Sequence, residues 1–229
     1  MRSSSLAAAA GALAVRGKYD DWKFGNMFNL GPASNTIAKA TYTLPSPAEP
    51  LSRTRMPSLG CRSGTDLFQP LLNWAPNNAQ EGCPAANDAW CVAASTFTGT
   101  EQVAQSYVAI PNKSNVDFEL TYDASKGVTQ KVWINGALLV AEDKNGKAPT
   151  WIYSSNECYS GACGTLGAYS WSNLTVTLSE ADSYFGDTLQ LTGGSSSGIK
   201  TTDGGKTWHA DSIKINEDYF YTDGSKKQC

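Results

Sequence analysis

Short runs in which apolar and polar residues alternate recur along the whole chain, and they constrain its fold more than any other feature. In the clearest run, 116–122, Val, Phe, Leu and Tyr alternate with Asp, Glu and Thr. Successive side chains of a strand point to opposite faces, so this run predicts a half-buried strand. Asn135-Gly136 joins two further runs, 128–134 and 137–142, and is a strong hairpin signal. Helical periodicity is almost absent.

About ten strands are expected in all. Beyond the three runs above, strands are predicted at 36–44, 65–74, 103–110, 174–178, 187–192 and 212–215. Many short strands with turns between them are typical of an all-β protein, and we predict an antiparallel β-sandwich or jelly roll. The chain has 229 residues and no internal repeat. We therefore expect 17–229 to form a single β-sandwich domain.

The N-terminal segment 1–16 resembles a secretory signal peptide. Arg2 supplies a positive start, 6–15 is a short apolar run, and Ala12-Leu13-Ala14 has the form of a cleavage site. An Ala-rich tail without such a function is the alternative. The segment predicts a secreted, extracellular protein. In a secreted protein, the Asn112-Lys113-Ser114 and Asn173-Leu174-Thr175 sequences would also be glycosylation acceptors.

Six cysteines support secretion, because an even number in an oxidising compartment favours disulfides. Fifteen pairings of six cysteines are possible. Close spacing favours two bridges and leaves a third by subtraction: Cys83–Cys91, Cys158–Cys163 and Cys61–Cys229. A zinc site is a poor alternative, because the chain has a single histidine and no close pair of Cys-x-x-Cys units.

The charge balance limits the partners. The net charge is −3, the isoelectric point is about 5.2, and no basic stretch exceeds a few residues, so a nucleic-acid partner is not expected. No apolar run approaches the roughly 20 residues of a membrane helix. We expect a monomer without a membrane partner, a cofactor or a metal.

Two motifs favour structural over catalytic roles. The sequence of 201–208 is similar to the Asp-box of sialidases and related propellers, but it occurs once, whereas a propeller repeats it. It predicts a hairpin turn in which Asp203 accepts from the following amides and Trp208 packs behind. A serine or cysteine triad would need His209, the only imidazole, which follows this turn directly. We expect no triad.

Gln69 is the most informative polar residue. In the strand 65–74 one face is wholly apolar, whereas the other sets Gln69 between Leu67 and Leu71. A covered amide without a partner is costly. Gln69 is therefore expected either to bond a backbone neighbour or to line a concave surface that faces a ligand. Three of the seven tryptophans are candidates for lining the same groove: Trp74, Trp90 and Trp151.

The order of several motifs resembles that of the fungal eqolisins, glutamic endopeptidases with a concanavalin-like β-sandwich, and their uncharacterised secreted relatives. Leu67-Phe68-Gln69 looks like the strand that carries the family's catalytic glutamine. Thr150-Trp151-Ile152 resembles the segment before its catalytic glutamate. The other similar segments are Tyr19 to Trp22, Thr41 to Ser46, Asn87 to Trp90 and the hairpin at Asn135-Gly136.

The resemblance implies an acid-active endopeptidase in which a glutamate is the general base and a glutamine amide positions the water and stabilises the oxyanion. Gln69 would supply the amide and Glu157 the carboxylate. Counting without a gap puts Ser154 at the family's glutamate position, three residues before Glu157. The ligand is expected to be a polypeptide held in a concave groove. A non-peptidase β-sandwich that binds or processes glycans is the alternative.

Overall fold

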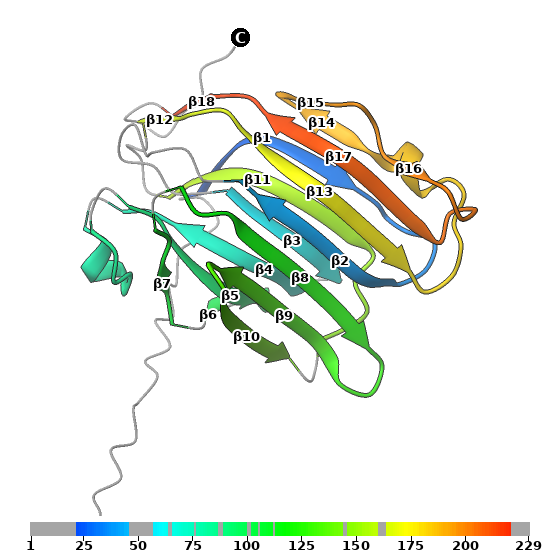
Figure 1. The fold of residues 1–229 in the computed structure, drawn as a ribbon, viewed down its shortest axis with the longest axis horizontal. Helices are drawn as coiled ribbons and strands as arrows, with labels where there is room; N and C mark the ends of the chain where they lie inside the picture. Colours follow the sequence, from blue (N-terminus) through cyan, green and yellow to red (C-terminus); the bar gives the residue numbers. More distant parts are fainter. Residues whose placement is uncertain are drawn as a thin grey trace, which may run out of the picture.

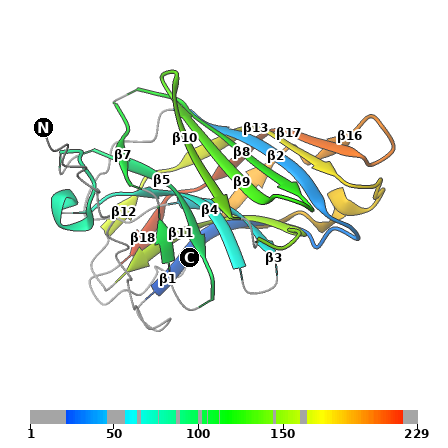
Figure 2. The same ribbon diagram turned by 90° about the horizontal axis from the view of Figure 1, so that it is seen from below.

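Two large antiparallel β-sheets stacked face to face make up the fold in the computed structural model (Figures 1 and 2). In Figure 2 the strands of the first sheet lie below those of the second. The structure describes 22–45, 57–63, 66–75, 77–86, 89–99, 102–104, 106–111, 113–143, 146–159 and 164–220, without the side chains of 22, 57–63, 102, 104 and 159.

Sheet A has the strand order β14-β1-β11-β3-β4-β5-β6, with β7 also paired to β5. Its strands are β1 (Trp22–Leu30), β3 (Pro57–Ser63), β4 (Asp66–Asn73), β5 (Cys91–Phe97), β6 (Gln102–Ala104), β7 (Val108–Ala109), β11 (Trp151–Tyr159) and β14 (Gln190–Thr192).

Sheet B has the order β10-β9-β8-β2-β13-β17-β15, with β16 paired to β17. Its strands are β2 (Ile37–Leu44), β8 (Val116–Asp123), β9 (Gly127–Ile134), β10 (Ala137–Asp143), β13 (Tyr169–Leu178), β15 (Gly194–Ser196), β16 (Lys200–Thr201) and β17 (Thr207–Ile215). A small third sheet pairs β12 (Gly164–Leu166) with β18 (Asp218–Phe220), and two 3₁₀ helices, η2 (Asn78–Glu81) and η3 (Phe185–Thr188), complete the described elements.

The hydrophobic core lies between the sheets. Phe28, Phe68 and Ile152 of sheet A and Phe118 and Trp171 of sheet B belong to one buried cluster. Because side chains alternate along each strand, these residues define the inner faces, and their neighbours in sequence form the outer faces that are turned away from the partner sheet. The predicted all-β antiparallel sandwich is confirmed.

Individual strands agree with the alternation to different degrees. The predicted strands at 116–122, 128–134 and 137–142 are present as β8, β9 and β10, and Asn135 and Gly136 turn between the last two with positive φ. The run 103–110 instead contains the two short strands β6 and β7, and only 190–192 of 187–192 is a strand. No helix among the described residues is long and apolar enough to cross a membrane.

The segment between Trp74 and Trp90 is held together from within. Asn78, fully buried, accepts from the backbone NH of Ala75 at 2.9 Å and donates to the carbonyls of Ala86 and Ala89 at 2.6 and 2.9 Å. The Cys83–Cys91 disulfide is present as predicted and ties η2 to β5. These contacts brace the described residues of this segment.

Two other predictions about the cysteines and the termini remain predictions. Cys158 is disulfide-bonded, but the side chains of Cys61, Cys163 and Cys229 lie outside the described part of the chain. The predicted signal peptide 1–16 and the start of the predicted domain also lie outside the described residues.

The predicted turn at 201–208 is confirmed. Asp203 accepts from the backbone NH groups of Lys206 at 3.1 Å and Thr207 at 2.8 Å, and Trp208 is buried behind the turn against Phe185. The hydrogen bond from the Thr207 amide is the main cause that holds the pKa of Asp203 below its usual range. The motif serves a structural purpose in this chain.

Candidate functional site

Gln69 lies on the outer face of sheet A. Its neighbours Phe68 and Leu72 belong to the core cluster, so Gln69 points away from sheet B, as does Leu71. The side chain of Gln69 is nevertheless only 4% exposed. The amide of Gln69 is therefore covered although it lies on an outer face, as one of the two alternatives from the sequence required.

Strand register sets the neighbours of Gln69. Gln69 pairs with Ser95 on β5, and the pairing of β3 with β4 keeps one register, which places Gly60 opposite Gln69 on the other side. Gly60 pairs in turn with Tyr153 on β11, and Tyr153 with Asn29 on β1. We call these five residues the Gln69 row. Tyr153 is thus the side chain on the Gln69 side of β11, two strands away.

Glu157 shares the outer face with Gln69 but not the row. It follows Tyr153 by four residues on β11, which corresponds to about 13 Å along a strand. Because β3 lies between β11 and β4, two strand spacings of about 5 Å each separate them laterally as well. A single bridging water cannot span this separation. The structure therefore does not bring the two predicted catalytic residues together.

Ser154, the alternative position for the glutamate, lies on the inner face. It is fully buried, and its Oγ accepts a hydrogen bond from Trp171 Nε1 at 2.9 Å. Strand β11 pairs with β3 without a register shift from Trp151 to Asn156, so its alternation is regular over this stretch. Neither the position counted without a gap nor the nearby glutamate faces Gln69 from its own row.

Asn156, the residue before Glu157, belongs to a polar cluster at one end of the sandwich. Asp218, buried on β18, accepts from the backbone NH of Asn26 and from Asn156 Nδ2, both at 2.5 Å, and Tyr169 donates to Asn156 Oδ1 at 2.8 Å. Burial raises the pKa of Tyr169, and the negative charges of Asp218 and Glu157 add to that rise. Asn156 therefore connects the Asp218 carboxylate with the Tyr169 hydroxyl.

The three tryptophans predicted to line a groove occupy different places. Trp74 and Trp90 are 6% and 5% exposed, belong to the core cluster and meet edge to face with ring centroids 6.5 Å apart. Both side chains are therefore largely covered and contribute to the core. Trp151 is half-buried and lies on the outer face of β11, two residues before Tyr153.

Sequence reasoning missed Gln130, which contacts strand β5 from the inner side of the sandwich. Gln130 lies on the inner face of β9, and its Nε2 donates to the Ser95 carbonyl at 2.9 Å and to Thr96 Oγ1 at 3.2 Å. It joins sheet B to the backbone position that pairs with Gln69. The available signal was a glutamine at an inward position of a strand that is otherwise apolar on that face.

The chemistry open to the Gln69 row follows from its members. The row offers two amides, a phenol and a hydroxyl, and no carboxylate. Such groups can donate hydrogen bonds to a polar ligand and accept hydrogen bonds from it. Among the described residues no group of three or more His, Cys, Asp or Glu is placed to hold a metal ion. The row is suited to binding and does not contain a carboxylate acid–base group.

The fold is similar to that of known peptidases. A crystal structure of scytalido-glutamic peptidase with a peptide based transition state analog has a TM-score of 0.50 and 12% identity, and covers 83% of this chain and 97% of that chain. A second, with a transition state analog inhibitor, has a TM-score of 0.50 and 12% identity over 82% and 97% of the two chains. At this identity the similarity shows the fold alone, and it supports the resemblance to eqolisins at that level.

No protein family model and no curated protein matches this sequence.

Proposed function

We propose that this chain is a polypeptide-binding protein with a glutamic-peptidase fold that holds an extended peptide on the outer face of sheet A without cleaving it. The observation that carries the proposal is the register of the Gln69 row, in which Tyr153 faces Gln69 from two strands away and Glu157 lies four residues further along. The row contains the amide of Gln69 and no general base beside it.

Two further observations support a polypeptide ligand. The scytalido-glutamic peptidase structure with the same fold contains a peptide based transition state analog, so this architecture accommodates a peptide. The Gln69 row also offers donors and acceptors from two other strands, namely the amide of Asn29 and the hydroxyl of Tyr153, which are both half-buried. Peptide backbones present both donors and acceptors and match such a mixed surface.

Binding is tested with the purified, folded protein and fluorescently labelled unstructured peptides, by anisotropy at several pH values. Gln69→Leu should weaken binding about tenfold, because one buried hydrogen-bonding partner is lost. Gln80→Leu is the matched control, since Gln80 is an exposed glutamine on η2, outside the Gln69 row. Equal affinity of both variants and the parent protein would count against the proposal.

Hydrolysis is tested with denatured protein substrates between pH 2 and 7. We expect no cleavage by the parent protein. Cleavage that disappears in Gln69→Ala and in Glu157→Gln would replace the binding proposal with an acid peptidase that uses these two residues, which requires the register to differ in solution. Peptide binding with no cleavage at any pH supports the proposal.

A gain of function tests the row itself. Tyr153→Glu places a carboxylate two strands from Gln69, where the side chains can share a water. We expect slow cleavage of denatured protein at acidic pH in this variant. Tyr153→Gln is the control, with similar shape and no acid–base group. Absence of cleavage by a folded Tyr153→Glu protein would argue that the row is not equivalent to a peptidase centre.

A further inference from the structure

A second candidate ligand site lies on sheet B, away from the Gln69 row. A surface cavity of about 280 Å³ opens beside the hairpin formed by β16 and β17. This is slightly below the roughly 300–1,000 Å³ of pockets for drug-sized ligands, so it fits a ligand about as large as one sugar ring. Its polar lining residues are Ser197, Lys200, Thr202, Thr207, His209 and Asp211.

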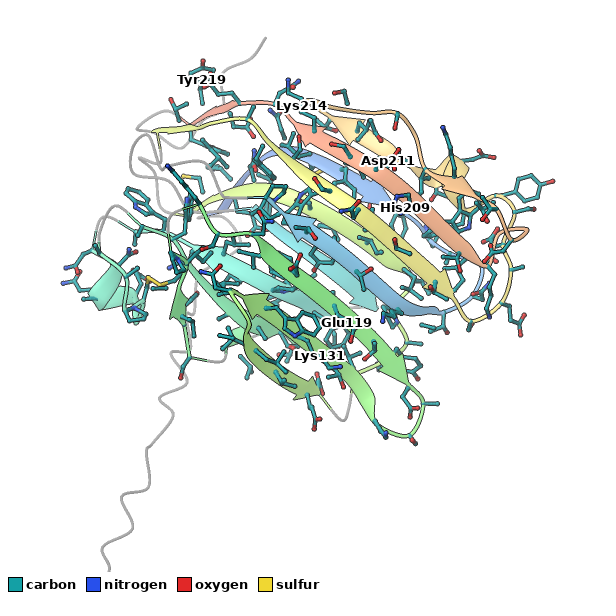
Figure 3. The ribbon with its side chains drawn as sticks, in the orientation of Figure 1. Glu119, Lys131, His209, Asp211, Lys214 and Tyr219 are labelled. Carbon is teal, nitrogen blue, oxygen red and sulfur yellow. A yellow bond between two sulfur atoms is a disulfide. The ribbon has the colours of Figure 1, made fainter. Side chains whose placement is uncertain are left out.

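His209 is held in place within this cavity. Its Nδ1 lies 3.0 Å from Thr175 Oγ1 on β13, and its Nε2 lies 3.1 Å from Asp211 Oδ1. Figure 3 shows His209 and Asp211 close together on β17. Both ring nitrogens are engaged with protein groups, so the flat ring is fixed as part of the cavity wall. A ring held from both sides offers a pre-organised contact surface to a ligand.

The charges around the cavity favour a neutral ligand over an anion. Lys200 pairs across the strands with His209, and the Asp211 carboxylate lies beside Nε2 on the other side of the ring. One ammonium and one carboxylate balance each other, and the hydroxyls of Ser197, Thr202 and Thr207 act as donors or acceptors. This set matches a polyol, whose hydroxyl groups both donate and accept.

We propose that this cavity binds one ring of a neutral saccharide. The sugar hydroxyls bond to the Asp211 carboxylate and the Lys200 ammonium, and a ring face lies against the imidazole of His209. The site is separate from the Gln69 row, because its residues come from β16, β17 and the preceding turn of sheet B. The saccharide proposal can therefore be tested independently of peptide binding on sheet A.

The test begins with a glycan array, followed by NMR titration of the full chain with the soluble methyl glycosides that score. We expect saturable binding of at least one neutral saccharide. Asp211→Asn and Lys200→Ala should each weaken it about tenfold, because a hydrogen bond to a charged group is lost. Lys214→Ala is the matched control, since Lys214 is an exposed lysine on β17 outside the cavity lining.

The binding measurements on the parent protein and its variants distinguish support for the proposal from its refutation. Saccharide binding that both cavity variants weaken and Lys214→Ala leaves unchanged supports the proposal. It is overturned if the parent protein binds no neutral saccharide at millimolar concentration. It is also overturned if the cavity variants bind as the parent does, or if inorganic phosphate or sulfate binds there and neutral sugars do not. Peptide affinity measured on the same variants should stay constant, which keeps this result distinct from the Gln69 test.

Discussion

The two outer faces of the sandwich both carry polar residues, but these residues differ in how far they are exposed. On sheet A, Gln69 and Glu157 are 4% and 8% exposed, and Ala93 on β5 is fully covered. On sheet B, Lys39 and Lys131 keep 47% and 36% of their side chains exposed while both contact Glu119. Figure 3 shows Glu119 and Lys131 next to each other on β8 and β9.

This difference separates a covered face from an ordinary solvated one. Exposed polar groups on a sheet stay hydrated, and their pairing across strands stabilises the fold only modestly. A polar group that is covered has lost its contacts with water, so a substitution there costs more free energy of unfolding than one on a solvated face.

The largest difference in stability between the two faces is expected when a carboxylate is introduced on each of them in turn. Ala93→Asp buries an unpaired charge on sheet A and should lower the free energy of unfolding by about 3–5 kcal/mol at pH 7. Thr177→Asp places the same group on the outer face of sheet B, opposite Lys39, and should change it by about 0.5 kcal/mol or less. Urea unfolding monitored by tryptophan fluorescence measures both.

Ala93→Asn separates the size of the new side chain from its charge. The difference in the free energy of unfolding between the Ala93→Asp and Ala93→Asn variants should decrease as the pH falls, because the new carboxyl group takes up a proton. Equal losses for Ala93→Asp and Thr177→Asp would show that the two outer faces do not differ in solution.

A smaller effect is expected where β11 presents successive serines to opposite faces. Ser154→Ala removes the acceptor of Trp171 Nε1 in the core and should cost about 1–3 kcal/mol. Ser155 lies on the outer face and donates to the adjacent Asn156 carbonyl at 3.1 Å, so Ser155→Ala should cost about 1 kcal/mol or less. Chemical denaturation of the pair measures both; the reverse order would contradict the assigned parity of β11.

Local signals sufficed for much of the fold. Strict alternation placed β8 and β9, Asn135-Gly136 placed the hairpin to β10, and a spacing of eight residues predicted the Cys83–Cys91 bridge. Four strands of sheet A were not among those predicted from alternation, namely β1, β3, β5 and β11. Strand β3 begins with Pro57, contains Gly60 and lacks alternation. Proline and glycine are both uncommon inside strands, so pattern reasoning favours a loop there.

The neighbours of Gln69 lay beyond sequence reasoning for a different reason. The face of Gln69 followed from local alternation. The identity of Tyr153 as its counterpart depends on two strand registers, and one of them pairs Gly60 with Tyr153, 93 residues further along the chain. A slip of one residue in either pairing would exchange the faces of β11, and no local signal fixes it. The burial of Trp74 and Trp90 likewise depends on packing against distant strands.

The smallest effect is expected on the solvated face, at Glu119. Burial would raise the pKa of its carboxyl, but hydrogen bonds from Lys39 and Lys131 at 2.6 and 3.0 Å, with their charges, hold that pKa below its usual range. A folded-state pKa below the unfolded value of about 4.3 stabilises the fold above that pH, and the gain disappears as the pH falls through the folded pKa.

Glu119→Gln should therefore lower the free energy of unfolding by about 0.5–1 kcal/mol at pH 7, and the difference from the parent should shrink toward zero below about pH 4. Because the two lysines are well exposed, 1 M salt should reduce the difference at pH 7 as well. Urea unfolding across this pH range measures both effects. A difference that stays constant with pH and salt would mean that Glu119 acts through packing, and that the outer face of sheet B is less solvated than its exposed lysines indicate.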